Sequence, residues 1–403
     1  MRNQKISILK FIDHWVGGPI CIFLALIFRI THPFYKTVLS IPVSGIPPKK
    51  ILIIKFFGLG SITLASSIIS SIRNNYKDTK IYFLTFKDNK QIHDLLSFSD
   101  HIVIIDTKNP FVLLKTIVQS IFYLQKERID IVLDIEFYSK FTTIMSFLSG
   151  ARWRMGFYLA KFWRNSLVNV PIYFNYSRHI LEIYAMFSKA LLIENPNLEP
   201  SEIVVSAEDK RELMKILETQ GINNLEHMIG INIHASDLAF GRRWPQSKFV
   251  ELIEVFLVKY PHMKVVLTGV KGEMEYSRAF IELLPEQSRR RTVDLTGKIS
   301  LKLFLALLSE LPLFVTNDTG PFHLAKAVRA RTISLWGPGS VDLYGPFQKE
   351  KERHDVVYKR YPCSPCLYIY RTDAGFFCNG KAPCMEAIEP SEVITLIDRR
   401  LKS

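Results

Sequence analysis

Runs of apolar residues alternate with segments of helical periodicity along most of this chain of 403 residues. From Lys50 onward, the pattern predicts strands at 51–56, 80–86, 101–105 and 130–135, with helices at 61–74, 110–126 and 140–149 between them. A second series predicts strands at 228–234, 264–269, 292–297, 313–318 and 332–337, with helices near 246–259, 273–284, 300–309 and 321–329. Continuous apolar strands that alternate with helices are typical of parallel sheets covered on both faces. We therefore predict an α/β protein of two doubly wound, Rossmann-like domains.

The two series also give the expected domain boundaries. A chain of this length accommodates two domains, at about 150 residues for each. We expect a basic and apolar N-terminal segment at 1–48, a first domain at 49–200 and a second domain at 201–388. The second domain includes a cysteine-rich loop at 361–385, and residues 389–403 contain a C-terminal helix. Ligands of doubly wound sheets bind beyond the carboxyl ends of the strands, so the site residues are expected there.

The composition of the N-terminal segment indicates association with a membrane. Residues 15–28, WVGGPICIFLALIF, carry no charge, and the basic residues Lys10, Arg29 and Lys36 flank them. A helix that crosses a bilayer needs about 20 apolar residues, and this run is shorter. We interpret it as a monotopic helix that lies in the surface of a membrane. A buried helix and a signal peptide are the alternatives.

The charge balance narrows the class of partner. The chain contains 52 Lys and Arg against 38 Asp and Glu, a net charge of +14. Such a surface suits a nucleic acid, an anionic lipid or a phosphorylated substrate. No RNA-binding aromatic motif, zinc finger or long basic run occurs, so we exclude nucleic acid as the expected partner.

The segment TNDTGPFHLAKAVRARTISLWGPGS (316–340) combines a strand end with the start of a helix. The amide groups of such a first turn, together with the helix dipole, bind anions. Asp318 can accept hydrogen bonds from ligand hydroxyls, and Thr319, Gly320 and His323 lie in or beside the turn. Asp318 or Thr319 acting only as a helix cap is the alternative.

Two further strand ends carry similar chemistry. In INIHASDLAFGRRWPQSKF (231–249), a turn of small residues precedes Arg242 and Arg243, either of which could hold a diphosphate through its planar guanidinium. A solvated charge pair beside a packed tryptophan is the alternative. Glu273 ends the next strand–turn segment, where it could accept a ribose hydroxyl or cap the following helix.

Together these segments closely resemble glycosyltransferase family nine, the heptosyltransferases of lipopolysaccharide assembly, from about Lys50 to Val393. The resemblance implies a GT-B fold, in which two Rossmann-like domains face each other across a cleft and a C-terminal helix crosses back to the first domain. It implies a nucleotide-sugar such as ADP-heptose in the second domain, a glycolipid acceptor in the first and no required metal. The residues that it assigns to the diphosphate, nucleotide and sugar are Ser236, Arg242, Glu273, Asp318, Thr319, Gly320 and His323.

The first glycine turn departs from the family pattern. The family has G-x-G-D, whose aspartate serves as general base, whereas this chain reads Gly58-Leu59-Gly60-Ser61. A serine accepts no proton at neutral pH unless another base activates it. We hypothesise that Glu136, at the end of the fourth strand, replaces the aspartate. A carboxylate at a helix N-terminus is the alternative role for Glu136, and we expect Ser61 to cap its helix and to donate to substrate.

Two other segments have open roles. ARWRMGFYLAKFWRN (151–165) places Arg152 and Arg154 among aromatic residues, which suits contact with lipid phosphates, although an exposed basic loop would look the same. Four cysteines, Cys363, Cys366, Cys378 and Cys384, have a spacing that suggests a structural zinc site, but a second C-x2-C is missing, so the metal stays undecided.

The resemblance to family nine implies that this protein is a metal-independent, inverting glycosyltransferase. It would move a sugar, with heptose expected, from a nucleoside diphosphate to a lipopolysaccharide core or another lipid-linked saccharide. We expect it to be peripheral or monotopic at the cytoplasmic face of the bacterial inner membrane. A catalytically silent GT-B scaffold of a surface-polysaccharide assembly complex is the alternative, and Ser61 is its main support.

Overall fold

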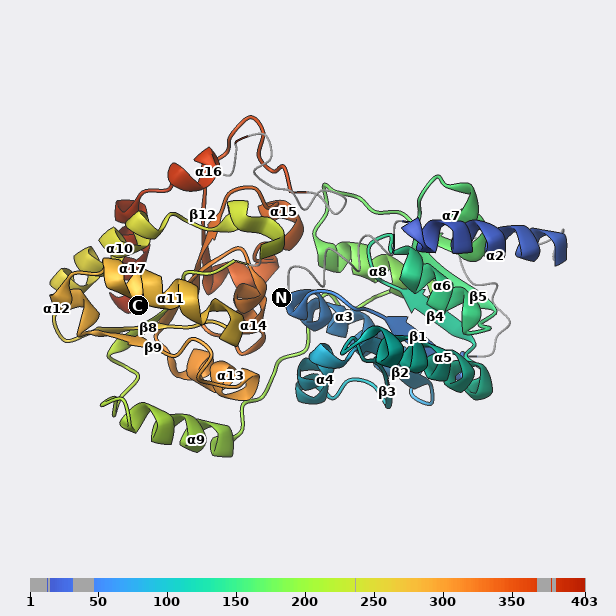
Figure 1. The fold of residues 1–403 in the computed structure, drawn as a ribbon, viewed down its shortest axis with the longest axis horizontal. Helices are drawn as coiled ribbons and strands as arrows, with labels where there is room; N and C mark the ends of the chain where they lie inside the picture. The colour runs from blue at the N-terminus through green and yellow to red at the C-terminus, as the bar shows by residue number, and fades with distance from the viewer. Residues whose placement is uncertain are drawn as a thin grey trace. The chain divides into compact units, whose positions relative to one another are not determined.

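Each half of the chain folds around its own parallel sheet (Figure 1). The structure is a computed structural model that describes residues 13, 15–31, 47–235, 237–367, 378 and 382–402. The chain divides into a first unit, Met1–Ser201, and a second unit, Glu202–Ser403.

The sheet of the first unit has the strand order β3-β2-β1-β4-β5-β6, and every neighbouring pair is parallel. Its strands are β1 (Lys50–Ile54), β2 (Lys80–Phe86), β3 (His101–Ile105), β4 (Ile131–Asp134), β5 (Trp153–Phe157) and β6 (Val170–Ile172). The order reverses between β1 and β4. At such a switch point, the connections that leave the two neighbouring strands run to opposite faces, which opens a crevice at their carboxyl ends.

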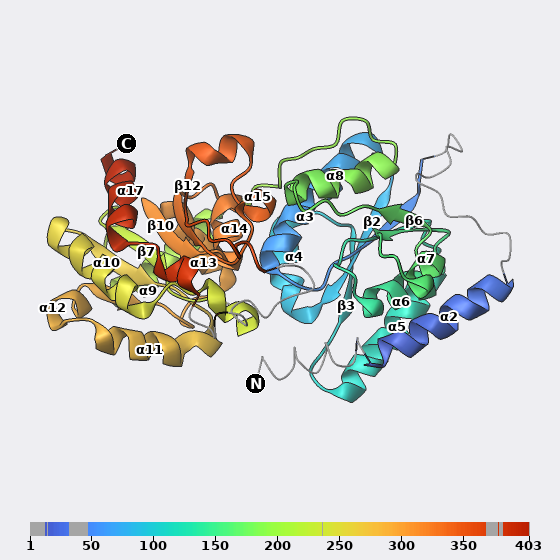
Figure 2. The ribbon, with the colours of Figure 1, turned by 90° about the horizontal axis from the view of Figure 1, so that it is seen from above.

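The helices of the first unit form two groups. They are α2 (Gly17–Thr31), α3 (Leu59–Asn75), α4 (Lys90–Leu96), α5 (Pro110–Glu127), α6 (Lys140–Leu148), α7 (Phe162–Leu167) and α8 (Ile180–Ala190), with the 3₁₀ turn η1 (Lys87–Asn89). Helix α3 contacts α4 and α8, whereas α6 contacts α5 and α7. Right-handed crossovers place these two groups on opposite faces of the sheet. Helix α2 packs outside α6 and α7 as a further layer (Figures 1 and 2).

The second unit repeats this topology with the order β12-β11-β10-β7-β8-β9, again parallel throughout. Its strands are β7 (Met228–Asn232), β8 (Lys264–Leu267), β9 (Thr292–Asp294), β10 (Leu313–Asn317), β11 (Thr332–Trp336) and β12 (His354–Tyr358). The longer helices are α9 (Ala207–Glu218), α10 (Gln246–Lys259), α11 (Met274–Leu283), α13 (Leu301–Glu310), α14 (Gly320–Ala327) and α17 (Pro390–Lys402). The short helices and 3₁₀ turns are η2 (Asp237–Arg242), η3 (Lys271–Glu273), α12 (Glu286–Arg289), α15 (Val341–Tyr344), η4 (Gln348–Glu352) and α16 (Pro383–Glu386). The switch point lies between β7 and β10.

The predicted doubly wound α/β architecture is confirmed in each unit. The apolar runs that predicted strands correspond to β1–β4 and β7–β11. The central strands β1, β4, β7, β10 and β11 are almost entirely buried, whereas the edge strands β3 and β9 are only partly buried. The prediction missed the outer strands β5, β6 and β12. Strand β5 has the sequence WRMGF, and its arginine hides the apolar run that signals a strand.

The C-terminal helix α17 packs on the second unit. The apolar face of α17 belongs to the core of the second unit, where Val393 and Ile397 pack in the same cluster as Trp244 and Phe256. The Tyr260 hydroxyl donates to Asp398 Oδ1 at 2.7 Å, which ties α17 to the end of α10. These contacts attach α17 to the core of the second unit, and its predicted crossing to the first domain stays a prediction.

A buried histidine gives the second unit a defined response to acid. His354 at the start of β12 pairs through Nδ1 with the Thr332 hydroxyl at 2.9 Å, and burial lowers its pKa from 6.5 to about 3. Between these two values the unfolded chain binds a proton that the folded chain does not, so stability falls as the pH drops below 6.5.

We therefore expect His354 to lower the free energy of unfolding by about 2 kcal/mol when the pH falls from 7.5 to 5. Urea unfolding at both pH values should show that His354→Gln removes this part of the loss, because glutamine keeps a hydrogen bond to Thr332 and takes up no proton. The exposed His262, changed to glutamine, is the control and should leave the pH dependence as in the wild type. Equal pH dependence in the wild type and His354→Gln would contradict the prediction.

Candidate functional site

Glu136 lies at the switch point of the first sheet, just after β4. Its side chain is 4% exposed. Oε1 accepts from Lys55 Nζ at 2.7 Å and from the Phe137 amide at 3.2 Å, and Oε2 accepts from the amides of Phe56 at 2.9 Å and Phe57 at 3.0 Å. A carboxylate offers about four lone-pair sites, and four donors occupy them here.

This arrangement favours a structural role for Glu136. A general base needs a lone pair that faces its substrate, so Glu136 could accept a proton only after one of its four donors is released. The hypothesis that it is the base therefore receives no support from this geometry. The helix-terminus alternative does not apply either, because α6 begins four residues later, at Lys140. Instead, the carboxylate joins the end of β4 to the turn that follows β1.

The turn after β1 presents Ser61 differently from its prediction. Gly58 has a φ of 86°, in the left-handed region that favours glycine, and is itself the N-cap residue of α3. Ser61 therefore lies in the first turn of the helix and does not cap it. A Cβ at Gly58 would approach the Ser61 hydroxyl oxygen to 3.0 Å, so the half-buried serine lies directly over this glycine. Gly60 is buried within the helix.

A second buried charge pair, Asp134 with Arg164, lies at the carboxyl end of β4. Asp134, the last residue of β4, is fully buried, accepts from the Thr142 hydroxyl at 2.9 Å and lies 3.7 Å from Arg164 Nη2. Burial raises the pKa of Asp134 to about 7, against the opposing effect of the Arg164 guanidinium. Arg164 also donates to the Phe157 carbonyl at 2.9 Å, so it links β4, β5 and α7.

The predicted lipid contact at Arg154 is wrong. Arg154 is buried and donates from Nε to the Leu167 carbonyl at 2.7 Å and from Nη1 to the Ala151 carbonyl at 2.8 Å. Its guanidinium lies 5.3 Å from the ring centres of Phe28 and Phe147. Arg152 is exposed, with its guanidinium 5.3 Å from the Trp153 ring, and is still placed for an anionic partner.

In the second unit, an asparagine spans the switch point between β7 and β10. Asn317, the last residue of β10, donates from Nδ2 to the His234 carbonyl at 3.0 Å and accepts at Oδ1 from the Trp244 amide at 3.1 Å. Both partners belong to the segment that follows β7. The two loops at the carboxyl ends of these strands are therefore held together by one buried side chain.

The predicted donor contacts Arg242 and Asp318 come together and pair with each other. Arg242 Nε lies 3.4 Å from Asp318 Oδ2, and Nη1 donates to the Asp318 carbonyl at 3.2 Å. Burial raises the pKa of Asp318, which the guanidinium opposes. Gly339 passes so close that a Cβ there would lie 1.9 Å from Asp318 Oδ2. Asp318 is thus enclosed, and its carboxylate orients Arg242.

The turn that opens α14 has the predicted form. Thr319 is the N-cap residue, but its hydroxyl donates to the Asn317 carbonyl at 3.3 Å and does not cap the helix. A Cβ at Gly320 would meet no atom within 4 Å, so space remains beside this turn. His323 is buried in the first turns, with its ring centre 6.3 Å from that of Tyr344. The helix terminus therefore keeps the features of an anion site.

Two other predicted donor residues have different outcomes. Glu273 accepts from the Val270 amide at 2.8 Å within the 3₁₀ turn η3, and as the N-cap residue of α11 it makes no side-chain cap hydrogen bond to that helix. Ser236 lies outside the described residues.

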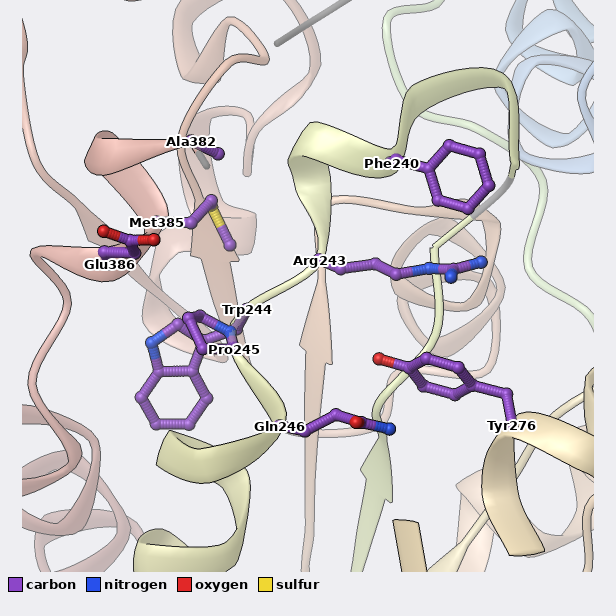
Figure 3. Close-up of a pocket in the computed structure, with 9 residues that line it drawn as sticks. All are labelled: Phe240, Arg243, Trp244, Pro245, Gln246, Tyr276, Ala382, Met385 and Glu386. Carbon is purple, nitrogen blue, oxygen red and sulfur yellow. The ribbon is translucent and has the colours of Figure 1, made fainter. Parts of the chain in front are cut away.

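A pocket of about 350 Å³ opens beside the loop that follows β7 (Figure 3). Arg243 lies in it between two aromatic rings, 4.6 Å from the centre of Phe240 and 4.8 Å from that of Tyr276. Its Nη2 donates to the Ala235 carbonyl at 2.9 Å. Trp244, Pro245, Gln246, Ala382, Met385 and Glu386 complete the lining.

This pocket separates the two arginines that the sequence left as alternatives. Arg243 lines the pocket, whereas Arg242 pairs with Asp318. Sequence reasoning missed Phe240 and Tyr276, because aromatic residues occur throughout the chain and nothing in their spacing marks these two. The half-exposed Phe240 ring follows the small-residue turn directly, which is the one signal that could have found it.

The four cysteines differ in their exposure to solvent. Cys363 is exposed, Cys366 and Cys378 are partly exposed and Cys384 is buried, and none of them forms a disulfide bond among the described residues. Burial, and secondarily the thiols of Cys366 and Cys363, raise the pKa of Cys384 to about 11. Within the part of the chain that the structure describes, no group of three or more His, Cys, Asp or Glu side chains is placed to hold a metal ion. Zinc therefore remains a prediction from spacing alone.

Comparison with known proteins gives the family. The sequence profile of glycosyltransferase family 9 (heptosyltransferase) matches residues 122–372, more than half of the chain. The chain belongs to glycosyltransferase family 9. The lipooligosaccharide heptosyltransferase 2 of Campylobacter jejuni is 27% identical over 183 residues, 45% of this chain and 53% of that protein. Lipopolysaccharide heptosyltransferase 1 of Campylobacter coli is 23% identical over 303 residues, 72% of this chain and 84% of that protein. The chain thus spans about half the length of the first relative and most of the second.

A solved structure agrees with this family assignment at the level of the fold. The E. coli ADP-heptose lps heptosyltransferase II superposes with a TM-score of 0.69 over 87% of this chain and 98% of that chain, at 17% identity. At this identity the likeness concerns the fold alone. It confirms the GT-B-like pair of parallel α/β sheets that the resemblance implied.

Proposed function

We propose that this family 9 protein transfers a sugar, with heptose expected, from a nucleoside diphosphate to a lipopolysaccharide core or another lipid-linked saccharide. The observation that carries the proposal is Arg243 between Phe240 and Tyr276 in the pocket of the second unit. Aromatic faces stack on a nucleobase, and a guanidinium beside them attracts phosphate. The two relatives are named as heptosyltransferases, which supports the choice of sugar and acceptor.

The second unit provides the groups that a departing diphosphate requires. The first turn of α14 and Arg242 lie at the carboxyl end of β10, and both favour negative charge. In the proposed reaction, the acceptor hydroxyl attacks the anomeric carbon, the bond from that carbon to the diphosphate oxygen breaks, and the configuration inverts. Positive charge fixed in advance stabilises the leaving group, so the proposal requires no metal.

The base that takes the hydroxyl proton is the open step of this mechanism. Neither Ser61, whose hydroxyl is not basic at neutral pH, nor Glu136, whose carboxylate is occupied by four donors, fills this role as arranged. This is the feature that favours the alternative, a GT-B protein that binds a nucleotide-sugar without transferring the sugar.

Nucleotide binding tests the proposal. Purified protein should be stabilised against heat by ADP more than by GDP or UDP, with a shift that grows with concentration. Tyr276→Ala should weaken ADP binding by about 5- to 150-fold in calorimetry, because stacking on one aromatic ring contributes about 1–3 kcal/mol.

The exposed Tyr173 of the first unit, changed to alanine, is the matched control and should bind ADP as the wild type does. Failure of all three nucleotides to stabilise the protein would remove the donor site from the proposal. ADP binding without sugar transfer to any lipid-linked acceptor would favour the silent alternative.

A glycolipid acceptor also implies a place of action. We propose that the protein works as a peripheral protein at the cytoplasmic face of the bacterial inner membrane, because the acceptor is anchored there and the net charge of +14 favours an anionic surface. Among the described residues, no helix is long and apolar enough to cross a membrane.

A further inference from the structure

Helix α2 is amphipathic in the reverse sense. Its protein-facing side consists mainly of small residues spaced by four, Gly17, Cys21 and Ala25, which let it approach α6 and α7 closely. Its outer side carries large apolar side chains, all at least 40% exposed: Trp15 just before the helix, then Val16, Ile20, Ile22, Phe23, Leu26, Ile27 and Ile30. A helix that faces water places its large apolar residues inward and its polar residues outward. The outer side of α2 therefore suits an apolar surrounding.

Both ends of α2 are fastened to the first unit. Before the helix, the Asp13 carboxylate accepts from the Ser139 hydroxyl at 3.0 Å and from the Phe141 amide at 2.8 Å, at the start of α6. Near its end, Arg29 Nε donates to the Ser166 hydroxyl at 2.9 Å. These contacts fix which side of α2 faces outward. The exposure of its large apolar side chains is therefore determined by the packing of the first unit.

A second apolar surface lies on the same side of the sheet. The exposed residues Phe111, Leu114, Val118 and Phe122 follow one face of α5 at helical spacing. Helix α6 contacts both α5 and α2, which places the two helices on one side of the first unit (Figure 2). Exposed apolar surface of this extent marks an interaction site.

The charges on this side select an anionic partner. Helices α2, α5 and α6 contain the basic residues Arg29, Lys115, Lys126 and Lys140, which are exposed or partly exposed, whereas Arg164 of α7 is buried. Their one acidic residue is Glu127, which pairs with Lys50 at 2.8 Å. The 15 residues of α2 span about 22 Å, less than the roughly 30 Å of a bilayer core, so the helix fits in the plane of a leaflet.

We propose that α2 and α5 form one lipid-docking surface of the first unit, with their apolar faces in the outer part of an anionic leaflet. The large residues of α2 and the α5 stripe enter the boundary between headgroups and acyl chains, and the neighbouring basic residues meet lipid phosphates. Since Asp13 joins α2 to α6, which follows Glu136 and β4, docking would hold the strand ends of this unit at a fixed place relative to the surface. This deepens the proposed function, on which it rests for the identity of the acceptor.

Vesicle co-sedimentation of the full chain tests the proposal. The wild type should bind phosphatidylglycerol-containing vesicles more strongly than vesicles of phosphatidylcholine alone. Phe23→Glu on α2 and Phe111→Glu on α5 should each lower the partition coefficient by about tenfold or more. Val258→Glu, an equally exposed apolar position on α10 of the second unit, is the matched control and should keep wild-type binding.

The possible outcomes separate the proposal from its rivals. Wild-type vesicle binding by either Phe23→Glu or Phe111→Glu would overturn it, as would equal binding to neutral and anionic vesicles. A wild-type dimer in light scattering that Phe23→Glu converts to monomers, without vesicle binding, would assign the surface to a second copy and also overturn it. Unchanged thermal unfolding shows that the variants fold, and ADP binding retained by a variant that no longer binds vesicles leaves the proposed function intact.

Discussion

Replacing Glu136 by glutamine is expected to lower the free energy of unfolding of the first unit by about 3–5 kcal/mol. The Glu136 carboxylate is the counter-ion of Lys55, whose side chain is 1% exposed. It also accepts hydrogen bonds from the amides of Phe56 and Phe57, which begin the turn after β1. Glutamine has nearly the same shape but leaves a buried ammonium without its charge partner. Urea unfolding followed by circular dichroism measures the loss.

A matched pair of variants separates structure from catalysis. Glu127→Gln breaks the partly exposed pair with Lys50 in the same unit and should lower the free energy of unfolding much less than Glu136→Gln does. If Glu136→Gln unfolds as the wild type does but has lost sugar transfer, the structural role is wrong and Glu136 is the general base after all. If Glu136→Gln loses stability and loses sugar transfer in proportion, Glu136 acts by positioning the turn that carries Ser61.

Changing Gly339 to alanine is expected to weaken the binding free energy of the nucleotide by about 1–3 kcal/mol, which lowers its affinity by about 5- to 150-fold. The new methyl group would lie 1.9 Å from Asp318 Oδ2, which is too close for either group to stay in place. Displacing Asp318 frees Arg242 from its ion pair and disturbs the first turn of α14. Calorimetry with ADP measures the affinity.

Gly272→Ala is the matched control for this substitution. A Cβ at Gly272 would meet no atom within 4 Å, so this variant of the same unit should bind ADP as the wild type does. Wild-type affinity in Gly339→Ala would show that the enclosure of Asp318 has no part in donor binding.

These two expectations concern side chains that the sequence marked without revealing their partners. Glu136 stood out as a carboxylate at the end of the fourth strand, and its burial among four donors turns a candidate base into a support for the β1 turn. Asp318 and Arg242 stood out as separate ligand contacts. Arg242 Nε lies 3.4 Å from Asp318 Oδ2, so the two side chains form an ion pair in which the carboxylate orients the guanidinium.

Periodicity was enough to predict the strands β1–β4 and β7–β11 and therefore the class of fold. Most residues of these strands are apolar and buried, and the polar ones lie mainly at the strand ends, so the apolar runs stand out in the sequence. Local chemistry also predicted the glycine turn and the start of α14, since both depend on backbone conformation within a few residues. The basic and apolar character of α2 is likewise visible in its composition.

The partners of each polar side chain depended on the tertiary structure, because they come from residues far apart along the chain. Arg154 looked like a surface residue and is buried against α2, Phe147 and the Leu167 carbonyl. Arg243, not Arg242, lines the pocket because Tyr276 approaches it from another helix. Which side of α2 faces outward was equally undecided, since its residues are apolar all around. Contacts with α6 and α7 decide this orientation, and with it which apolar residues of α2 stay exposed.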